Sequence, residues 1–372
     1  MKILFVINAL WIGGVEKALI NLVNSLDPKK YDITILSIMK DYSIRHLLKP
    51  HIKVKGIFPK KMKGIDHLFK YIPANILYKI FIREKYDIEV AYSDGKPVVL
   101  LGLNTISRAE KFTWIHQDIS RYERVINCYK SWSEYIESYK NFNNIFCVSR
   151  AANDSFKQVT GIDKSTVLYN IIPSHELLEK AKEELKVEKG NRLVFTTVGR
   201  LAKEKGIMRL LHIHKSLLDS GFEYSLWIIG DGPEKEEVQK FIIDNHLQDT
   251  VTLYGFQENP YKYIAASDLY ICPSYTEALS TTCIESLLLD VPILSTSVPG
   301  AEDILGDTKC GSIVENTTNA IYEELKRILS NPKELIMFRQ DIERAKSKFN
   351  EKDILRNLEN YWASEEFEYV GN

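Results

Sequence analysis

Two glutamates stand eight residues apart in the stretch YTEALSTTCIESLLLD, residues 275–290. Glu277 lies among small and hydroxyl residues, whereas Glu285 falls within the apolar pattern of a predicted helix. Thr282 and Glu285 fit the S/T-x-x-E capping box, in which the glutamate accepts a hydrogen bond from an unsatisfied backbone N–H. A carboxylate also accepts two hydrogen bonds at once, which suits a vicinal diol such as that of a ribose. Both roles remain open for Glu285, one structural and one ligand-binding.

Positive side chains follow another predicted strand in the segment GRLAKEKG, residues 199–206. Arg200 offers a planar fork for phosphate oxygens, and Lys205 offers a compact point charge. Two such cations at the carboxyl end of a strand can neutralise a diphosphate, although an exposed charged loop is the alternative. Ser280 and Thr281 precede a predicted helix, whose free N–H groups also favour phosphate oxygens.

Glycines mark two further loops. Gly13 and Gly14 follow the first predicted strand and precede a helix, so an anion could approach that helix N-terminus closely. The segment lacks the G-x-G-x-x-G dinucleotide fingerprint, and a tight strand–helix turn explains the two glycines nearly as well. Gly255 and Phe256 follow a later strand and could supply backbone contacts to a nucleotide base.

Strand and helix patterns alternate along the chain in two series, which predicts α/β domains with parallel sheets covered by helices on both faces. Predicted strands occupy residues 2–8, 31–38, 86–93, 111–116 and 143–149, then 192–199, 224–230, 250–255, 268–274 and 291–297. A charged segment near residues 170–192 separates the series. We expect one domain over residues 1–172, joined by a final helix over about 352–372, and a second over residues 173–351.

Composition limits the class of protein. The 372 residues include five scattered cysteines without a C-x-x-C motif, which argues against disulfide or zinc frameworks and indicates a reducing, cytoplasmic setting. No apolar run approaches the ~18–20 residues of a membrane span. Up to Pro173 there are 26 Lys and Arg against 16 Asp and Glu, a balance of +10, and the remainder carries −11. A basic first half favours an anionic partner, unless the charges are only a solubilising surface.

Several of these segments together resemble glycosyltransferase family 4. The resemblance rests on GRLAKEKG, on GDGPE at residues 230–234, on the Glu277 and Glu285 pair and on GGVEKA at residues 13–18. Their order and spacing extend over nearly the whole chain. The resemblance implies the GT-B fold, which consists of two Rossmann-like, doubly wound domains. It also implies a retaining enzyme that moves a sugar from a nucleotide-diphosphate sugar, UDP-linked in our prediction, to an acceptor.

The resemblance also implies roles for individual residues. Arg200 and Lys205 would bind the donor diphosphate and stabilise the charge that develops on it, and Gly14 would lie against the diphosphate or the acceptor. Glu277 would bind the transferred sugar, and Glu285 would bind the ribose. No metal or other cofactor is expected, because no D-x-D motif stands at a predicted loop. The leaving phosphate would act as the base, so no protein nucleophile is named.

Two features complete the predicted site. His116, in WIHQD, would line the sugar pocket from the first domain, with a satisfied structural histidine as the alternative. Leu279 and Ser280 stand where the family often has Phe-Gly, and Ala278 replaces a usual glycine or serine. The backbone amides of Leu279 and Ser280 would still meet the donor, although the Cβ of Ser280 restricts its approach. The identity of the donor sugar is therefore not carried over from the family.

The predicted partners are a nucleotide-sugar donor and a saccharide or lipid-linked acceptor in bacterial surface polysaccharide or glycolipid synthesis, and no nucleic acid. Residues 58–85 mix lysines with aromatic and aliphatic residues, which suits either a peripheral contact with an anionic membrane at its inner face or a core-packing helix with solvated lysines. Rival functions are a sugar-nucleotide epimerase, a non-catalytic sugar-nucleotide-binding subunit and a nicotinamide-dependent oxidoreductase. The missing G-x-G-x-x-G disfavours the last.

Overall fold

The computed structural model describes residues 1–11, 13–60, 62–119, 123–185, 187 and 190–363. Internal contacts divide the chain into unit 1, which comprises Met1–Ile172 and Glu351–Asn372, and unit 2, which comprises Pro173–Asn350. The tail aromatic residues Phe367 and Tyr369, which belong to the helix expected to about residue 372, lie outside the described residues.

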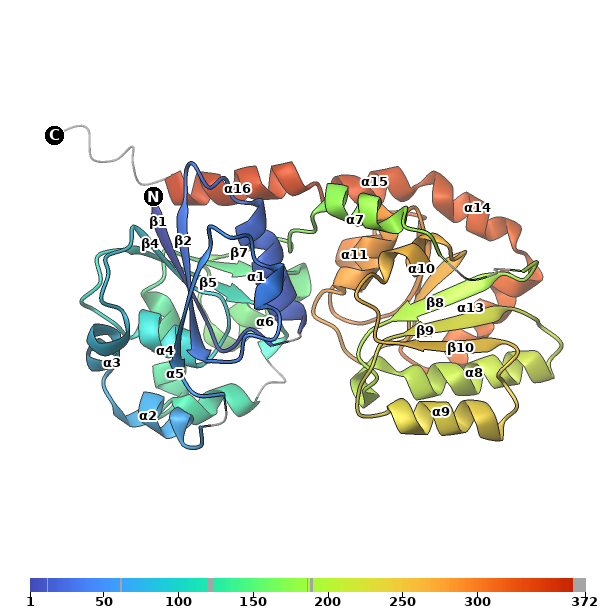
Figure 1. Ribbon diagram of the computed structural model, residues 1–372, viewed down its shortest axis with the longest axis horizontal. Helices are drawn as coiled ribbons and strands as arrows, with labels where there is room; N and C mark the ends of the chain where they lie inside the picture. The colour runs from blue at the N-terminus through green and yellow to red at the C-terminus, as the bar shows by residue number, and fades with distance from the viewer. Residues whose placement is uncertain (12, 61, 120–122, 186, 188–189, 364–372) are drawn as a thin grey trace. The chain divides into compact units, whose positions relative to one another are not determined.

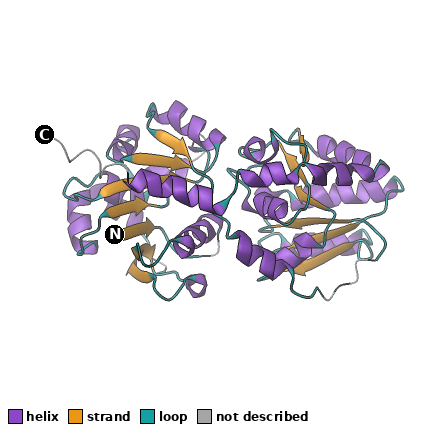
Figure 2. Cartoon of the chain, turned by 90° about the horizontal axis from the view of Figure 1, so that it is seen from above, coloured by secondary structure: helices purple, strands orange, loops and turns teal. Residues whose placement is uncertain are grey.

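The described residues of unit 1 form a seven-stranded parallel sheet in the order β3-β2-β1-β4-β5-β6-β7. Its interior strand β1 has five consecutive buried residues, because helices cover both faces of the sheet (Figures 1 and 2). The strands are β1 (Lys2–Ile7), β2 (Asp32–Met39), β3 (Lys53–Phe58), β4 (Ile88–Ala91), β5 (Glu110–Ile115), β6 (Asn144–Cys147) and β7 (Ser165–Val167). The helices are α1 (Gly14–Ser25), α2 (Ile65–Tyr71), α3 (Ala74–Phe81), α4 (Lys96–Gly102), α5 (Trp132–Lys140), α6 (Arg150–Thr160) and α16 (Glu351–Ala363), with short 3-10 turns η1 (Arg45–Leu47) and η3 (Glu123–Cys128).

Unit 2 repeats this plan with a six-stranded parallel sheet among its described residues, in the order β10-β9-β8-β11-β12-β13. Its strands are β8 (Val194–Val198), β9 (Ser225–Ile229), β10 (Val251–Gly255), β11 (Leu269–Cys272), β12 (Ile293–Thr296) and β13 (Gly311–Val314). Its helices are α7 (Ser174–Ala181), α8 (Ile207–Asp219), α9 (Lys235–Asp244), α10 (Tyr261–Ala265), α11 (Thr281–Leu288), α12 (Ala301–Leu305), α13 (Thr318–Ser330), α14 (Lys333–Gln340) and α15 (Ile342–Ser347), with the 3-10 turn η4 (Lys203–Lys205). The predicted α/β class with two parallel, doubly wound sheets is therefore confirmed.

The last described helix, α16, packs on unit 1. The Tyr31 hydroxyl donates to Glu359 at 3.0 Å, and the rings of Tyr31 and Trp362 lie 5.6 Å apart in an edge-to-face arrangement. Ser25, at the end of α1, donates to Glu351 at 2.7 Å. These contacts confirm that the final helix returns to the first domain.

Three strands that the sequence did not predict complete the sheets. β3 is an edge strand in which lysines alternate with partly buried residues, so it lacks the continuous apolar run of the central strands. β7 has three residues, and β13 has four and begins at Gly311. Short strands at the sheet margins bury little apolar surface, and they leave little pattern in the sequence.

The strand order reverses once in each sheet, between β1 and β4 in unit 1 and between β8 and β11 in unit 2. In open parallel sheets, ligands bind beyond the carboxyl ends of the strands at such a switch point. The loops after these four strands are therefore the places at which function is sought.

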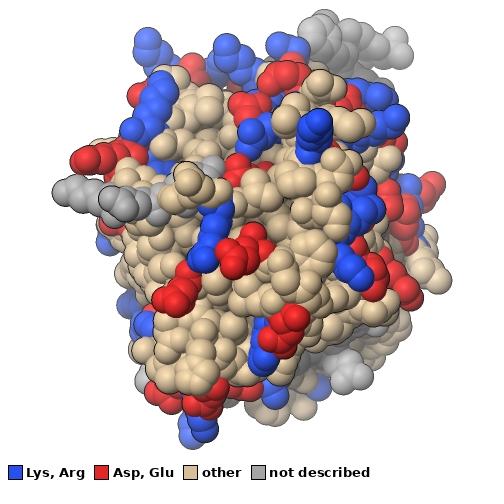
Figure 3. All heavy atoms as spheres, turned by 90° about the vertical axis from the view of Figure 1, so that its right-hand side faces the viewer, with Lys and Arg blue, Asp and Glu red and all other residues tan. Residues whose placement is uncertain are grey.

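Two observations concern the surface. Among the described residues, no helix combines the length and the apolar composition that a membrane-spanning segment requires. On the face of the molecule drawn in Figure 3, acidic and basic side chains are interspersed and neither sign forms a continuous area. This face therefore shows no continuous patch of one charge that would correspond to the charge difference between the two halves of the sequence.

Candidate functional site

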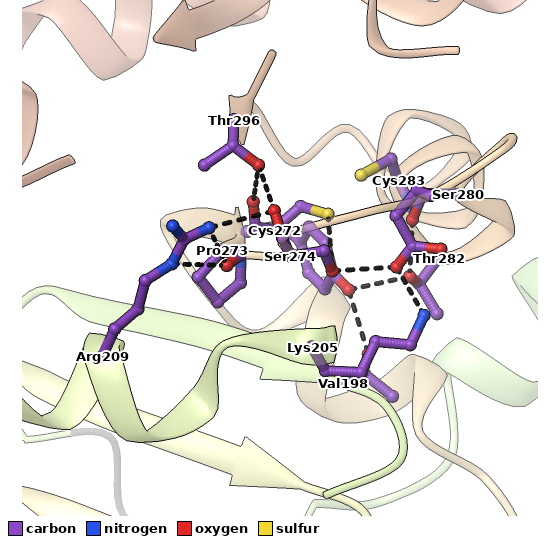
Figure 4. Close-up of polar contacts among 12 residues, drawn as sticks. Val198, Lys205, Arg209, Cys272, Pro273, Ser274, Ser280, Thr282, Cys283 and Thr296 are labelled. Atoms are coloured by element: carbon purple, nitrogen blue, oxygen red, sulfur yellow. Dashed lines mark hydrogen bonds and ion pairs between the residues drawn. The ribbon is translucent and has the colours of Figure 1, made fainter. Parts of the chain in front are cut away.

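A pocket lies at the switch point of unit 2, between the loops that follow β8 and β11 (Figure 4). The residues that line it are Thr197, Val198, Gly199, Lys205, Ile207, Tyr270, Cys272, Pro273, Ser274, Glu277 and Thr282. Two of the predicted site residues, Lys205 and Glu277, thus meet in one pocket although they are 72 positions apart in the sequence.

Lys205 and Glu277 form an ion pair across this pocket. The Lys205 ammonium contacts Oε1 of Glu277, and the Ser274 hydroxyl donates to the same oxygen at 2.8 Å. Burial alone would lower the pKa of Lys205, but the Glu277 carboxylate outweighs this effect and holds the pKa above its ordinary value. Lys205 is therefore a cation near neutral pH, and its side chain keeps 30% of its surface exposed. An anion that enters the pocket can compete with Glu277 for it.

A chain of hydroxyl groups leads from the pocket to the start of α11. The Tyr270 hydroxyl donates to the Val198 carbonyl at 3.1 Å and lies 2.8 Å from the Thr282 hydroxyl. Thr282 in turn lies 3.1 Å from the Ser280 hydroxyl, which caps α11 by accepting from the amide of Cys283 at 3.4 Å. The predicted amide-rich helix start at Ser280 and Thr281 is thus adjacent to the Lys205–Glu277 pair.

The capping box considered for Thr282 and Glu285 is wrong. Ser280 is the N-cap and α11 begins at Thr281, so Glu285 is the fifth residue of the helix and lies too far along it to cap the first turn. Glu285 is 1% exposed, and the Tyr261 hydroxyl donates to it at 3.4 Å. Its predicted contact with a ribose stays a prediction.

Arg209, which the sequence analysis did not select, is a buried cation beside the pocket. It lies in the first turn of α8, and its guanidinium donates to the carbonyls of Pro273 and Ser274, with Nε 2.8 Å from the first and Nη2 2.9 Å from the second. Its guanidinium carbon also lies 3.9 Å from the ring centre of Tyr275. Burial lowers the pKa of Arg209 from its ordinary value.

The remaining predicted residues of unit 2 lie at neighbouring loops. Arg200 is exposed directly after Gly199, at the end of β8. A Cβ at Gly230 would collide with the Gly199 carbonyl, so the loops after β8 and β9 approach as closely as their backbones allow. Gly255 ends β10 with φ +68°, and Phe256 beyond it is 60% exposed. Leu279, one residue before the α11 cap, is 8% exposed, so its side chain packs inward.

In unit 1, Gly13 caps α1 and Gly14 is its first residue. A Cβ at Gly14 would meet no neighbouring atom within 4 Å, so packing within unit 1 does not require a glycine at this position. Glu16, in the first turn, is 6% exposed, and burial raises its pKa to about 7. Burial therefore favours the protonated form of this carboxyl.

His116 follows β5 and packs against Tyr92, with 4.8 Å between the ring centres. Burial disfavours the imidazolium and lowers the pKa of His116 to about 4, so the ring is neutral at physiological pH. Its Nε2 atom is buried and has no hydrogen-bond partner among the described residues. A neutral ring with one unused nitrogen fits either a sugar-positioning role or a structural one.

Two residues that the sequence analysis missed stand beside the loops after β1 and β4. The Asn8 side-chain amide donates to Ser93 at 3.0 Å, and its Oδ1 lacks a partner among the described residues. Asp94 accepts from Tyr139 at 2.5 Å and from the Gly95 amide at 2.7 Å, while its Oδ2 also lacks one there. Burial raises the pKa of Asp94. Each follows a buried strand closely, which is the signal that could have identified them.

Among the described residues, no group of three or more His, Cys, Asp or Glu side chains is arranged to hold a metal ion. Asp87, Ile88 and Glu89, the nearest sequence to a D-x-D motif, run into β4, and the buried Glu89 accepts from the partly buried Tyr78 hydroxyl. A reaction without a metal remains a prediction.

A family model described as glycosyl transferases group 1 matches residues 179–348. Residues 179–348 therefore resemble a group 1 glycosyltransferase domain. This stretch contains the Lys205–Glu277 pocket, and the predicted kinship with glycosyltransferases is confirmed, whereas membership of family 4 stays a prediction.

Curated relatives carry consistent names. One is N-acetylgalactosamine-N,N'-diacetylbacillosaminyl-diphospho-undecaprenol 4-alpha-N-acetylgalactosaminyltransferase of Campylobacter jejuni, 31% identical over 172 residues, which are 46% of this chain and 46% of that protein. An uncharacterized glycosyltransferase of Methanocaldococcus jannaschii is 30% identical over 61% of both chains. A putative teichuronic acid biosynthesis glycosyltransferase of Bacillus subtilis is 30% identical over 49% of this chain and 46% of its own length. The chain thus spans about half to three fifths of the length of these relatives.

Solved structures resemble the chain over nearly its full length. Anabaena Alr3699/HepE in complex with UDP has a TM-score of 0.80 at 18% identity and covers 98% of this chain and 100% of its own. Sucrose-phosphate synthase of Thermosynechococcus elongatus has a TM-score of 0.76 at 16% identity and covers 98% of each chain. At this identity the likeness shows the fold alone, and it confirms the predicted GT-B architecture.

Proposed function

We propose that this protein is a retaining glycosyltransferase that moves a sugar from a UDP-sugar to a saccharide or lipid-linked acceptor. The observation that carries the proposal is the Lys205–Glu277 pair in the switch-point pocket of a group 1 glycosyltransferase domain. The names of relatives support these reactants, since that of the Campylobacter enzyme includes a diphospho-undecaprenol acceptor and the Anabaena protein was solved with UDP.

The donor would bind by exchanging partners at the ion pair. A diphosphate carries more charge than one carboxylate, so it would take Lys205 from Glu277, with the exposed Arg200 as a second cation. The Glu277 carboxylate is then available to accept hydrogen bonds from hydroxyls of the transferred sugar. As the bond to the sugar breaks, the two cations stabilise the charge that develops on the leaving diphosphate. The leaving phosphate serves as the base, and no metal is required.

The acceptor would use the corresponding edge of unit 1. Asn8, Asp94 and His116 follow β1, β4 and β5, which are neighbours in the sheet, and each has a buried polar atom without a partner among the described residues. Such atoms are costly to leave unsatisfied, and sugar hydroxyls can both donate to them and accept from them. This edge therefore suits a neutral, hydroxyl-rich ligand.

The proposal is tested by a thermal-shift screen of UDP-, GDP- and ADP-sugars, followed by an assay for free UDP. A UDP-sugar should raise the melting temperature, because a ligand that binds only the native state stabilises it. The double variant R200A/K205A should lose this shift, whereas K203A, which removes an exposed lysine of the same turn, should keep it. A normal shift in R200A/K205A contradicts the diphosphate assignment.

The assay for free UDP separates the rival functions. A glycosyltransferase releases UDP in step with transfer to an acceptor, whereas an epimerase converts its sugar nucleotide without releasing UDP. A binding subunit shows the thermal shift and no turnover with any acceptor. A product sugar of inverted anomeric configuration would contradict the retaining mechanism.

We further propose that unit 1 contacts an anionic membrane through the α2–α3 surface. We define this surface by the exposed apolar residues Met62, Tyr71, Ile76 and Ile80 and the exposed cations Lys63, Lys79, Arg83 and Lys85. Ile76 and Ile80 are each about half exposed and stand one turn apart on α3.

The charges on this surface favour an anionic bilayer over a neutral partner. Its two acidic neighbours are neutralised, since Asp66 pairs with Lys96 at 2.7 Å and Glu84 pairs with Lys55 at 2.5 Å. The four defining cations have no ion pair among the described residues. Aliphatic side chains flanked by free cations can enter the boundary between headgroups and acyl chains. A lipid-linked acceptor would be met at such a boundary.

Vesicle sedimentation tests this contact. The protein should sediment with phosphatidylglycerol vesicles at low salt and not with phosphatidylcholine vesicles. K79Q/R83Q should weaken binding by about tenfold or more, since a cation near an anionic surface contributes about 1 kcal/mol, and I76S/I80S should also weaken it. I336S/M337S removes two exposed apolar residues of α14 as the matched control. Equal losses in the control and the test variants would contradict the proposed surface.

A further inference from the structure

Arg209 directs all its polar contacts to one short loop. Its guanidinium meets the carbonyls of Pro273 and Ser274 and the ring of Tyr275, three consecutive residues between β11 and α11. Its side chain is buried, and it has no carboxylate partner among the described residues. Backbone dipoles and an aromatic face therefore hold this charge, which is an unusual arrangement for a buried cation.

The same loop carries Glu277 and is held from other sides. The Ser274 hydroxyl donates to Glu277 at 2.8 Å, while Thr296 of β12 donates to the Ser274 carbonyl at 2.7 Å. The Tyr275 amide donates to the carbonyl of Glu204 at 2.8 Å. Residues 273–277 are thus fastened both to the strand beside them and to the turn that contains Lys205.

The start of α8 lies directly against this loop. Gly206 has φ +68°, and a Cβ there would collide with the carbonyl oxygen of Pro273, which is also the oxygen that Arg209 binds. Lys205, Gly206 and Arg209 therefore act from one end of one helix: the first binds the Glu277 carboxylate and the other two fix the backbone that carries it.

We propose that Arg209 is a positioning residue that holds the 273–277 loop so that Glu277 faces the donor sugar. This inference rests on the proposed function and adds to it a residue that contacts neither reactant. Its action requires the fork of a guanidinium, which reaches two successive carbonyls at once and stacks on a ring, whereas a lysine ammonium is a single point. A tether of this kind affects the transferred sugar more than the nucleotide, because Glu277 is the group that it aims.

A double-mutant cycle with R209Q, E277Q and the combined variant tests the proposal. E277Q should lower kcat by about 100-fold and R209Q by about 10-fold. The kcat of the combined variant should match that of E277Q within about twofold, because Arg209 has no carboxylate left to position when Glu277 is replaced. The Kd of UDP should change less than about threefold in R209Q. R209K, which keeps the charge without the fork, should recover only part of kcat.

The matched control is R192Q. Arg192 is an exposed arginine that also donates to a backbone carbonyl, that of Asp249 at 3.2 Å, and R192Q should keep the wild-type kcat. Effects of R209Q and E277Q that multiply in the combined variant would overturn the proposal, because a residue that only stabilises the fold acts independently of Glu277. So would an R209Q variant with wild-type kcat.

Hydrogen exchange gives a readout that needs no substrate. In R209Q, exchange of the amides of residues 273–277 should accelerate, led by the Tyr275 amide that donates to Glu204, while helices distant from the loop keep their protection. Unchanged protection of the loop would overturn the proposal even if the chain transferred no sugar. A wild-type chain that neither binds UDP nor releases it would overturn the proposed function. Hydrogen exchange of residues 273–277 would then still test whether Arg209 holds the loop.

Discussion

At the switch point of unit 2 Lys205 and Glu277 are already paired with each other, whereas at the switch point of unit 1 polar atoms are left without partners among the described residues. Lys205, Glu277 and Ser274 satisfy one another in unit 2. His116 and Asp94 in unit 1 each keep one buried atom unused, and burial shifts the pKa of each toward its uncharged form. Two sheets of the same plan thus prepare different chemistry. A paired charge suits an anion that can displace one partner, and neutral groups suit hydroxyls.

The largest effect expected from breaking this contrast is that of K205A. Loss of one preorganised cation at the leaving group should lower the kcat/KM of the donor by about 10²–10³-fold, as for other electrostatic donors. The KM of the acceptor should stay within about twofold if the two edges serve different ligands. Steady-state kinetics with each substrate varied in turn checks both values. A change in the KM of the acceptor as large as the loss in kcat/KM of the donor would contradict the assignment of different ligands to the two units.

The next effect concerns the buried carboxyl of unit 1. Burial raises the pKa of Glu16 from 4.5 to about 7, so its contribution to stability is fully present below pH 4.5 and is lost as the pH rises through 7. E16Q imitates the protonated form. The free energy of unfolding of E16Q should therefore gain on that of the wild type by about 2–3 kcal/mol between pH 5 and pH 8, at 1.36 kcal/mol per unit of pKa shift. Urea titrations at both pH values measure this gain, and a constant difference would contradict a buried, neutral Glu16.

A smaller effect is expected from D94N. The amide keeps the size of the side chain and replaces one carboxyl oxygen by an NH2 group, which cannot accept a hydrogen bond, so acceptor binding should weaken by about tenfold, the cost of roughly one hydrogen bond. The Kd of UDP should remain unchanged, because Asp94 belongs to unit 1. Calorimetry with UDP and kinetics with the acceptor separate the two quantities, and a matching loss of UDP affinity would contradict the assignment of this edge to the acceptor.

The smallest expected effect concerns His116, for which we expect no dependence on pH. The pKa of His116 is lowered to about 4, so its ring stays neutral throughout pH 5.5–8. The ratio of kcat/KM between the wild type and H116N should therefore be constant over this range. A ratio that changes with an apparent pKa near that of a free imidazole would show that His116 titrates as an exposed group.

The sequence predicted the features that follow from regular strand patterns and from parallel strand order. Buried strands such as β1 leave continuous apolar runs, and parallel order places the loops that follow neighbouring strands side by side, so Lys205 and Glu277 could be assigned to one site across 72 positions. Arg209 could not be found in this way. Within the helical stretch IMRLLHIH it is one basic residue among apolar ones, and only the folded backbone shows that its guanidinium reaches the Pro273 carbonyl.

Predictions from local sequence patterns failed where the same side chains make tertiary contacts instead. Thr282 and Glu285 satisfy the capping pattern, yet Ser280 caps the helix and the Thr282 hydroxyl lies against Tyr270 instead. The edge strand β3 was missed because its lysines alternate with residues that are only partly covered. The partners of Asn8 and Asp94 come from other elements, so their unused atoms were visible only in three dimensions.

The bond between Lys205 and Glu277 has a consequence for turnover. Because Lys205 has Glu277 as its counter-ion, the Glu277 carboxylate could take the place of a nucleotide that leaves the proposed site. A small inorganic anion must likewise displace the Glu277 carboxylate before it can bind Lys205. If the proposed function is correct, the site should therefore favour ligands that carry two phosphates over ligands that carry one.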